Sequence, residues 1–488
     1  MDFAAIALFL VLYHLRVQEF LSIARSLRLV AFAMAFAMVA TFLRERGFKL
    51  KDLLKTPHDW FMLAFLIWTV VTGPNWTWGQ VYPVFLYYIM TVQALFRLNR
   101  LQWFLTIWAV MLIVVAGMAI ASEYGFDPTN ANDITHGAMK GRLILNTSIF
   151  NNPNALGHSV VPVVVMLFYL CFWKRPVAIK ILLLPLLLLP LYCIYLTQSK
   201  GAYLAGFVAI VSCLALGRPK AVQLGILFFA IFFGFGALYA LPRMQELNRG
   251  EQGIQGRIAA FGWGLNEMRT ETSGVGYGNW DPAFIRQNHY QKSPHSSYVH
   301  IGGEEGEPGL FLFLGIIYCC LRTLFTAKTT TVAEERVRRL LFVLVICYIV
   351  SSWMVGQAWR ATFFLMAAAV AAFHRHLLAQ EMPETEEAKE VAAEQKRESR
   401  LAPALRLKPL QPAFAMSTAL TPMSAMTATM PRTFTASGIR VTTVAANEKE
   451  EASAEKPLWN RINWVDLVLV LAMTYGTIRF WSYIIMHF

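Results

Sequence analysis

The chain has 488 residues, of which 56% are hydrophobic and only 15% charged, and this composition excludes an ordinary soluble globular protein. Its 43 basic and 30 acidic residues give a formal net charge of +13. The basic residues concentrate in short loops between apolar segments, which indicates determinants of membrane topology and no nucleic-acid partner. The six cysteines lie inside apolar segments without metal-ligand spacing, so neither a disulfide framework nor a zinc site is predicted.

Apolar segments of membrane-spanning length dominate the chain. A helix needs roughly 20 largely apolar residues to cross a bilayer. Candidate spans, thirteen with an uncertainty of one or two, fall near 3–22, 27–43, 59–73, 79–96, 101–121, 155–173, 179–197, 201–217, 222–241, 308–325, 339–357, 361–378 and 463–485. We therefore expect an all-α polytopic membrane protein with about 12–13 transmembrane helices.

The distribution of Lys and Arg predicts the orientation of these spans. The loop after the second span is rich in basic residues, as are the later even-numbered loops, whereas most odd-numbered loops are poor in charge. Because basic loops stay in the cytoplasm, the N-terminus is expected there, and the segments 122–154 and 242–307 are expected to face outward. One missed or surplus helix before residue 242 would invert both assignments.

Composition divides the chain into five parts. Residues 1–241 hold spans one to nine, 242–307 form one large polar loop, and 308–378 hold spans ten to twelve. Residues 379–460 begin with a charged Glu/Ala/Lys-rich stretch and continue as Ala, Thr, Pro and Met, which predicts a disordered cytoplasmic linker. Residues 461–488 form an extra C-terminal span.

The polar loop carries the side chains best suited to chemistry. Arg257 and His295 lie in it, and Lys200 lies at the predicted outward end of the eighth span. Cations at a membrane surface bind phosphate, and a histidine can accept or position a hydroxyl proton. Taken singly, Lys200 is equally explained as a residue whose amine reaches the interface, and a loop arginine or histidine as structural. Their occurrence on one face favours a site.

Carboxylate pairs that would hold a divalent metal are missing from the sequence. There is no Asp-x-Asp pair, and Asp127, Asp133 and Asp281 are isolated. An enzyme that expels a diphosphate must neutralise the developing charge with a metal ion or with fixed cations. The sequence therefore predicts chemistry without a metal and without a cofactor.

Two further groups of residues allow two interpretations each. The segment Phe150–Gly157 contains Asn and Pro at a helix start, where the amides either cap the helix or line an outward cavity. The aromatic residues of the polar loop either stack on sugar rings or form an interfacial belt; they are Trp263, Tyr277, Trp280 and Tyr298.

Taken together, four ordered pieces resemble the O-antigen ligase and polymerase superfamily of bacterial inner-membrane proteins. They are Phe150–Gly157, Leu196–Ala202, Gly256–Trp263, and Gly274–Gly278 followed by His295–Tyr298 and Glu305–Leu310. The pieces extend from about 150 to 325, and the helix count also fits. The segment 380–488 has no counterpart in the resemblance.

The resemblance implies a multi-pass protein of the inner membrane with a C-type glycosyltransferase fold and a periplasmic active site between helices 9 and 10. It implies an inverting, metal-independent enzyme whose donor is a glycan on a polyprenyl diphosphate, as in an O-antigen ligase, a polysaccharide polymerase or a protein O-oligosaccharyltransferase. The acceptor would be a hydroxyl of lipid A core, of a growing glycan or of a protein, and the other partner is the lipid bilayer.

Residue by residue, the resemblance assigns His295 to activation or positioning of the acceptor hydroxyl, and Arg257 and Lys200 to the diphosphate. Lys200 departs from the family's arginine and lacks its bidentate fork. The predicted substrate-binding residues are Ser199, Asn154, Trp263, Tyr298 and Arg360.

Two other functions remain open from the sequence. A transporter or flippase of a lipid-linked glycan would use the same cations to bind headgroups without bond chemistry, although such proteins tend to carry ionisable residues within their spans. An assembly scaffold would depend on the linker 379–460.

Overall fold

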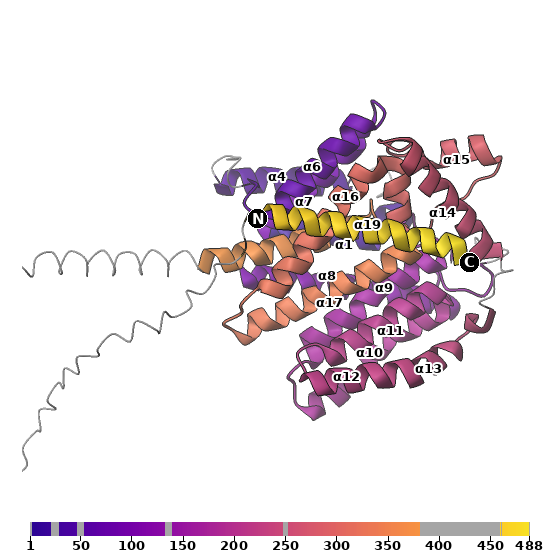
Figure 1. Ribbon diagram of the computed structural model, residues 1–488. Helices are drawn as coiled ribbons and strands as arrows, with labels where there is room; N and C mark the ends of the chain where they lie inside the picture. The colour runs from indigo at the N-terminus through magenta and orange to yellow at the C-terminus, as the bar shows by residue number, and fades with distance from the viewer. Residues whose placement is uncertain are drawn as a thin grey trace, which may run out of the picture. The chain divides into compact units, whose positions relative to one another are not determined.

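The computed structural model describes residues 2–20, 29–45, 53–131, 139–246, 252–380, 459 and 461–487. Most of the predicted linker 379–460 lies outside these residues. Within them the regular secondary structure is helical, and turns and loops join the helices (Figure 1). The helices are α1 (Asp2–Leu15), α2 (Val17–Phe20), α4 (Leu29–Glu45), α6 (Pro57–Thr72), α7 (Thr77–Ala94), α8 (Leu98–Glu123), α9 (Pro153–Leu167), α10 (Val177–Thr197), α11 (Lys200–Ala215), α12 (Lys220–Phe229), α13 (Phe235–Tyr239), α14 (Gln252–Thr270), α15 (Trp280–Asn288), α16 (Ser297–Thr326), α17 (Val332–Met354), Ala361–Gln380 and α19 (Trp464–His487).

Many of these helices have the length and composition of membrane spans. Among the described residues, eight are long and apolar enough to cross a membrane, and three shorter apolar helices accompany them. Each of the thirteen segments expected from the sequence overlaps a described helix. The predicted class, an all-α polytopic membrane protein, is confirmed.

The helices differ in the fraction of their side-chain surface that is buried against other helices. The middle of α9 and the helix Ala361–Gln380 are buried, as Val160 and Phe364 show at 0% exposure. By contrast α10 and α12 expose large apolar side chains, among them Leu182 and Phe229. Such exposed apolar surface suits contact with lipid tails. The buried helices therefore form the core of the bundle.

A kink in α16 frees backbone carbonyls that the polar loop binds. Gly306 has a φ of +68°, and Pro308 has no backbone N–H, so the carbonyls one turn earlier lose their helical partners. Val275 N donates to the Gly303 carbonyl at 2.9 Å, and Gly276 N donates to the Glu304 carbonyl at 2.8 Å. The broken helix thus binds the glycine-rich turn of residues 274–278.

The last helix, α19, packs against α14 and α16; it is drawn in yellow in Figure 1. Near one end, Trp481 donates its indole N–H to the Phe261 carbonyl at 3.0 Å. Near the other, the buried Asp466 forms an ion pair with Arg322 and accepts the Tyr318 hydroxyl at 2.7 Å. Polar anchors at both ends fix this helix to the elements that carry the polar loop.

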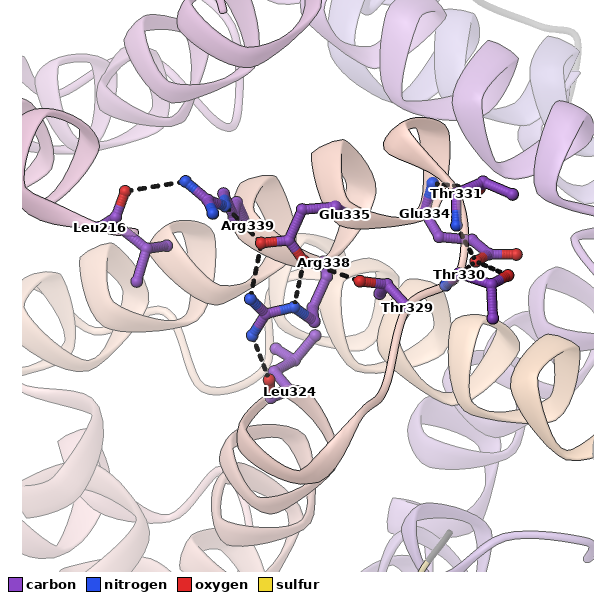
Figure 2. Close-up of polar contacts among 9 residues, drawn as sticks. All are labelled: Leu216, Leu324, Thr329, Thr330, Thr331, Glu334, Glu335, Arg338 and Arg339. Atoms are coloured by element: carbon purple, nitrogen blue, oxygen red, sulfur yellow. Dashed lines mark hydrogen bonds and ion pairs between the residues drawn. The ribbon is translucent and has the colours of Figure 1, made fainter. Parts of the chain in front are cut away.

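A second polar network holds the start of α17 (Figure 2). Glu335 accepts hydrogen bonds from both Arg338 and Arg339, at 2.7 and 2.5 Å. Arg338 also donates to the Leu324 carbonyl, and Arg339 to the Leu216 carbonyl, each at 3.0 Å. One carboxylate thereby ties the C-terminal ends of α16 and α11 to α17.

Candidate functional site

The segments expected to face outward meet around a cavity of about 400 Å³. Its walls come from the start of α9, the start of α15, the loop before α16, the first turns of α16, and residues 355–360. The lining side chains that bear on the chemistry are Asn152, Asn154, Trp280, Asp281, His295, His300, Glu304 and Arg360. Three of the predicted site residues, Asn154, His295 and Arg360, therefore come together here.

His295 lies among cations. Arg257 of α14 and Lys292 of the preceding loop both interact with it electrostatically. Burial, followed by these two charges, lowers the pKa of His295 to about 4. Its backbone φ is +49°, a region that few side chains adopt. A neutral imidazole is thus held beside two positive charges at the cavity wall.

The side chain of Lys292 lies close to the start of α14, where Arg257 is found. A Cβ on Gly256 would stand 2.5 Å from the Lys292 ammonium, so the glycine before Arg257 leaves room for this lysine. Burial and the charge of Arg257 lower the pKa of Lys292. Two cations brought this close favour any ligand that adds negative charge between them.

Arg142 is a cation that the sequence analysis did not identify. Its guanidinium donates to Asn154 Oδ1 at 3.1 Å and to the Thr197 carbonyl at 3.0 Å. Burial, followed by the charges of Arg243 and Arg257, lowers the pKa of Arg142 to about 10. The only sequence signal was its place in the outward segment 122–154, close to the Asn-rich helix start. The structure thus places the guanidinium of Arg142 close to the start of α11, where the resemblance implies an arginine and this chain has Lys200.

The Asn-rich helix start both caps α9 and shapes the site. Asn152 is the N-cap residue, and its side chain accepts the Asn154 backbone N–H at 2.9 Å. Asn154 Oδ1 in turn accepts the Ser199 hydroxyl at 2.8 Å. Because Asn152 and Asn154 also line the cavity, the two interpretations of this segment hold together. Helix capping fixes the amides that face the cavity.

Lys200 is the first residue of α11, directly after the capping residue Ser199. Within the described chain it is outside the lining of the cavity. A Cβ on the next residue, Gly201, would stand 2.8 Å from Met354, so α11 approaches α17 closely at this point. Lys200 is thus next in sequence to Ser199, whose hydroxyl donates to Asn154.

Two predicted sugar-contacting residues pack behind the cavity. Trp263 is 8% exposed, donates to Gln287 Oε1 at 2.6 Å, and meets the Trp280 ring edge to face. Tyr298 is 2% exposed and donates its hydroxyl to the Ile349 carbonyl at 3.0 Å. Of these aromatic residues, Trp280 is the one that lines the cavity.

Arg360 and an acidic group complete the walls. Arg360 donates to the Ile149 carbonyl at 3.0 Å, and burial lowers its pKa. On the α16 side, His300 Nε2 lies 3.2 Å from Glu304 Oε2. His300 was not among the predicted site residues; its signal in the sequence is the i, i+4 spacing to Glu304, which places both on one helix face. Within the described ranges, no group of three or more His, Cys, Asp or Glu side chains is arranged to hold a metal ion.

Comparison with known proteins agrees with the sequence motifs. Residues 185–314 match the family model described as O-antigen ligase, and this stretch contains Arg257, His295, His300 and Glu304. No curated protein and no solved structure matches the chain. The resemblance drawn from the ordered motifs is thereby confirmed: residues 185–314 of the chain are similar to the O-antigen ligase family.

Proposed function

We propose that this multi-pass membrane protein is an inverting glycosyltransferase that moves a glycan from a polyprenyl diphosphate to a hydroxyl acceptor. The observation that carries the proposal is the position of His295, which lines the cavity and interacts electrostatically with both Arg257 and Lys292. The O-antigen ligase match over residues 185–314 supports the same reaction class.

The reaction requires positive charge where the diphosphate leaves. The acceptor oxygen bonds to the anomeric carbon while the bond from that carbon to the diphosphate oxygen breaks, and the electron pair departs with the polyprenyl diphosphate. Fixed cations that are already oriented stabilise this charge without reorganisation. Arg257, Lys292 and Arg142 are the proposed cations, with Lys200 at their edge. Arg142 supplies the planar fork that Lys200 lacks.

The remaining predicted residues have positioning roles in this proposal. His295, neutral at physiological pH, hydrogen-bonds the acceptor hydroxyl and holds it beside the anomeric carbon. Asn154, fixed by Ser199 and Arg142, contacts the donor. Trp280, 2% exposed, forms part of the cavity wall and packs against Trp263. Arg360 forms part of the cavity wall.

We place the active site at the periplasmic face of the bacterial inner membrane, on the basis of the positive-inside pattern. The acceptor belongs to one of three classes: lipid A core, a growing glycan or a protein hydroxyl. Ligase, polymerase and protein-glycosylating activities share the donor chemistry and differ in the acceptor alone.

The test uses the full-length protein in nanodiscs with EDTA, a polyprenyl-diphosphate glycan and a panel of acceptors. Glycan transfer and free polyprenyl diphosphate are followed together. Transfer that persists in EDTA and is lost in His295→Ala supports the proposal, and the productive acceptor separates ligase from polymerase. Donor binding without release for any acceptor would contradict it and favour a flippase, which a lipid-flipping assay would then examine.

A further inference from the structure

The proposed transfer leaves one proton without a destination. As the acceptor oxygen bonds to carbon, its hydrogen must move to a base. His295 is poorly suited to keep it, because Arg257 and Lys292 oppose a third positive charge beside them. The cavity wall offers a second histidine, His300, whose neighbour is the carboxylate of Glu304.

The histidine–carboxylate pair on α16 has the arrangement of an oriented base. His300 Nε2 lies 3.2 Å from Glu304 Oε2, and the side chains are 26% and 2% exposed. Trp280 N donates to the second carboxylate oxygen, Oε1, at 3.1 Å, which fixes the plane of the carboxylate. Both side chains line the same cavity as His295. A buried carboxylate held in this way orients an imidazole and stabilises its protonated form.

The other ring nitrogen of His300 lies toward Gly356. A Cβ on Gly356 would stand 3.9 Å from His300 Nδ1, and Gly356 also lines the cavity. Because Nε2 faces the carboxylate, the proton of the neutral ring belongs on Nε2, which leaves Nδ1 as the acceptor. Trp280 packs its ring edge to face on the imidazole at 6.0 Å and limits its rotation.

We propose that His300, oriented by Glu304, is the catalytic base that removes the proton from the acceptor hydroxyl. The inference rests on the proposed glycosyl transfer and adds a residue to it. The hydroxyl proton moves to Nδ1 of His300 as the new carbon–oxygen bond forms, and the electron pair of the broken bond leaves with the polyprenyl diphosphate. The exposed part of His300 then returns the proton to water.

The charged side chains near the two histidines differ in sign. Arg257 and Lys292 are the charges that act on His295, whereas Glu304 and Asp281 line the cavity together with His300. Nearby carboxylates favour the protonated form of an imidazole, and nearby cations oppose it. Glu304 acts through His300 and is a positioning residue.

The test compares three variants of the full-length protein in nanodiscs: His300→Ala, Glu304→Gln and His289→Asn. His289 is an exposed histidine at the end of α15 with a φ of +65°, which asparagine tolerates, so it is the matched control. We expect transfer to a hydroxyl to fall by about 100-fold or more in His300→Ala. A smaller loss is expected in Glu304→Gln, and none in His289→Asn.

Azide distinguishes a lost base from a damaged site, because the anion attacks carbon without losing a proton. In His300→Ala and Glu304→Gln, azide should restore release of polyprenyl diphosphate and yield the glycosyl azide. Hydroxyl transfer at the rate of the unaltered protein in His300→Ala would overturn the inference. So would a loss of transfer that azide leaves unchanged while donor binding persists.

Two further results, a variant that does not fold and an inactive parent protein, are interpreted as follows. If His300→Ala fails to fold, as judged by its thermal unfolding in detergent, His300→Gln takes its place and the same azide criterion applies. If the unaltered protein releases no polyprenyl diphosphate with hydroxyl or azide, the proposed function itself is wrong. That result is distinct from active protein whose His300 variants behave like the parent.

Discussion

Arg142 and Asn154 are joined by a hydrogen bond of 3.1 Å, which connects a loop cation to the first turn of α9 at the cavity wall. The same amide oxygen accepts the hydroxyl of Ser199 at 2.8 Å, at the start of α11. The loop at Arg142, the start of α9 and the start of α11 are therefore held together at the point where we place the diphosphate.

Removal of this guanidinium should weaken donor binding. In Arg142→Ala, we expect the KM for the lipid-linked donor to rise about tenfold or more, since a charge-assisted contact to phosphate is worth about 1.5–3 kcal/mol. Arg142→Lys should recover part of the loss, because lysine retains the charge without the fork. The exposed Lys140 nearby supplies the control, Lys140→Ala, whose KM should be unchanged. An unaltered KM in Arg142→Ala would remove this residue from the site.

Loss of His295 should abolish transfer while the protein still inserts in the membrane. His295→Ala removes the imidazole that interacts with Arg257 and Lys292, and we expect turnover to fall at least about 100-fold. His295→Asn is the second variant, since asparagine accepts the φ of +49° and keeps a hydrogen-bonding group. Turnover close to that of the parent in both variants would show that His295 has no part in the reaction.

The buried position of His295 predicts a dependence of stability on pH. In the unfolded chain its imidazole binds a proton below about pH 6.5, whereas in the folded protein the pKa is about 4. Between these values the unfolded state binds more protons, so the free energy of unfolding decreases as pH falls from about 6.5 to about 4. The contribution of this group is at most about 1.4 kcal/mol per pH unit.

His295→Asn should show less of this decrease than the parent protein. The measurement is thermal unfolding in detergent at a series of pH values between 4 and 6.5. Other buried histidines affect both proteins equally, so the difference between the two curves reports on His295. Parallel curves would mean that His295 is protonated as readily in the folded chain as in the unfolded one.

The last helix should contribute to the stability of the site. Trp481 is fully buried, donates to the Phe261 carbonyl, and lies where a Cβ on Gly302 would stand 2.8 Å from its ring. We expect Trp481→Ala to reduce the free energy of unfolding by about 3–5 kcal/mol. Tyr475→Ala, at an exposed position of the same helix, is the matched control and should have little effect. Equal unfolding temperatures for the two variants would contradict a bracing role for α19.

Much of the fold followed from the sequence alone, for a physical reason. In lipid, backbone N–H and C=O groups must be satisfied within the segment, so an apolar stretch of sufficient length specifies a helix without further information. The predicted spans accordingly overlap the described helices. His295 and Arg257 could likewise be singled out, because charged and titratable side chains in an otherwise apolar chain are conspicuous.

The directions of side chains and the contacts between distant segments could not be predicted from the sequence. Tyr298 and His300 both lie in the first turns of α16, yet Tyr298 packs into the core and His300 lines the cavity. Two residues apart on a helix, they lie on different faces, whereas His300 and Glu304 share one. Which face is buried depends on the neighbouring helices.

The same limit applies to Arg142, Thr197 and Asn154. Their contacts arise because capping of α9 and the close approach of its neighbours bring separate loops to one corner. Hydrophobicity along the chain, a local property, determined that this protein is a bundle of membrane helices. The position of each cation, amide and carboxylate around the cavity is a non-local property, and packing of the helices in three dimensions decided it.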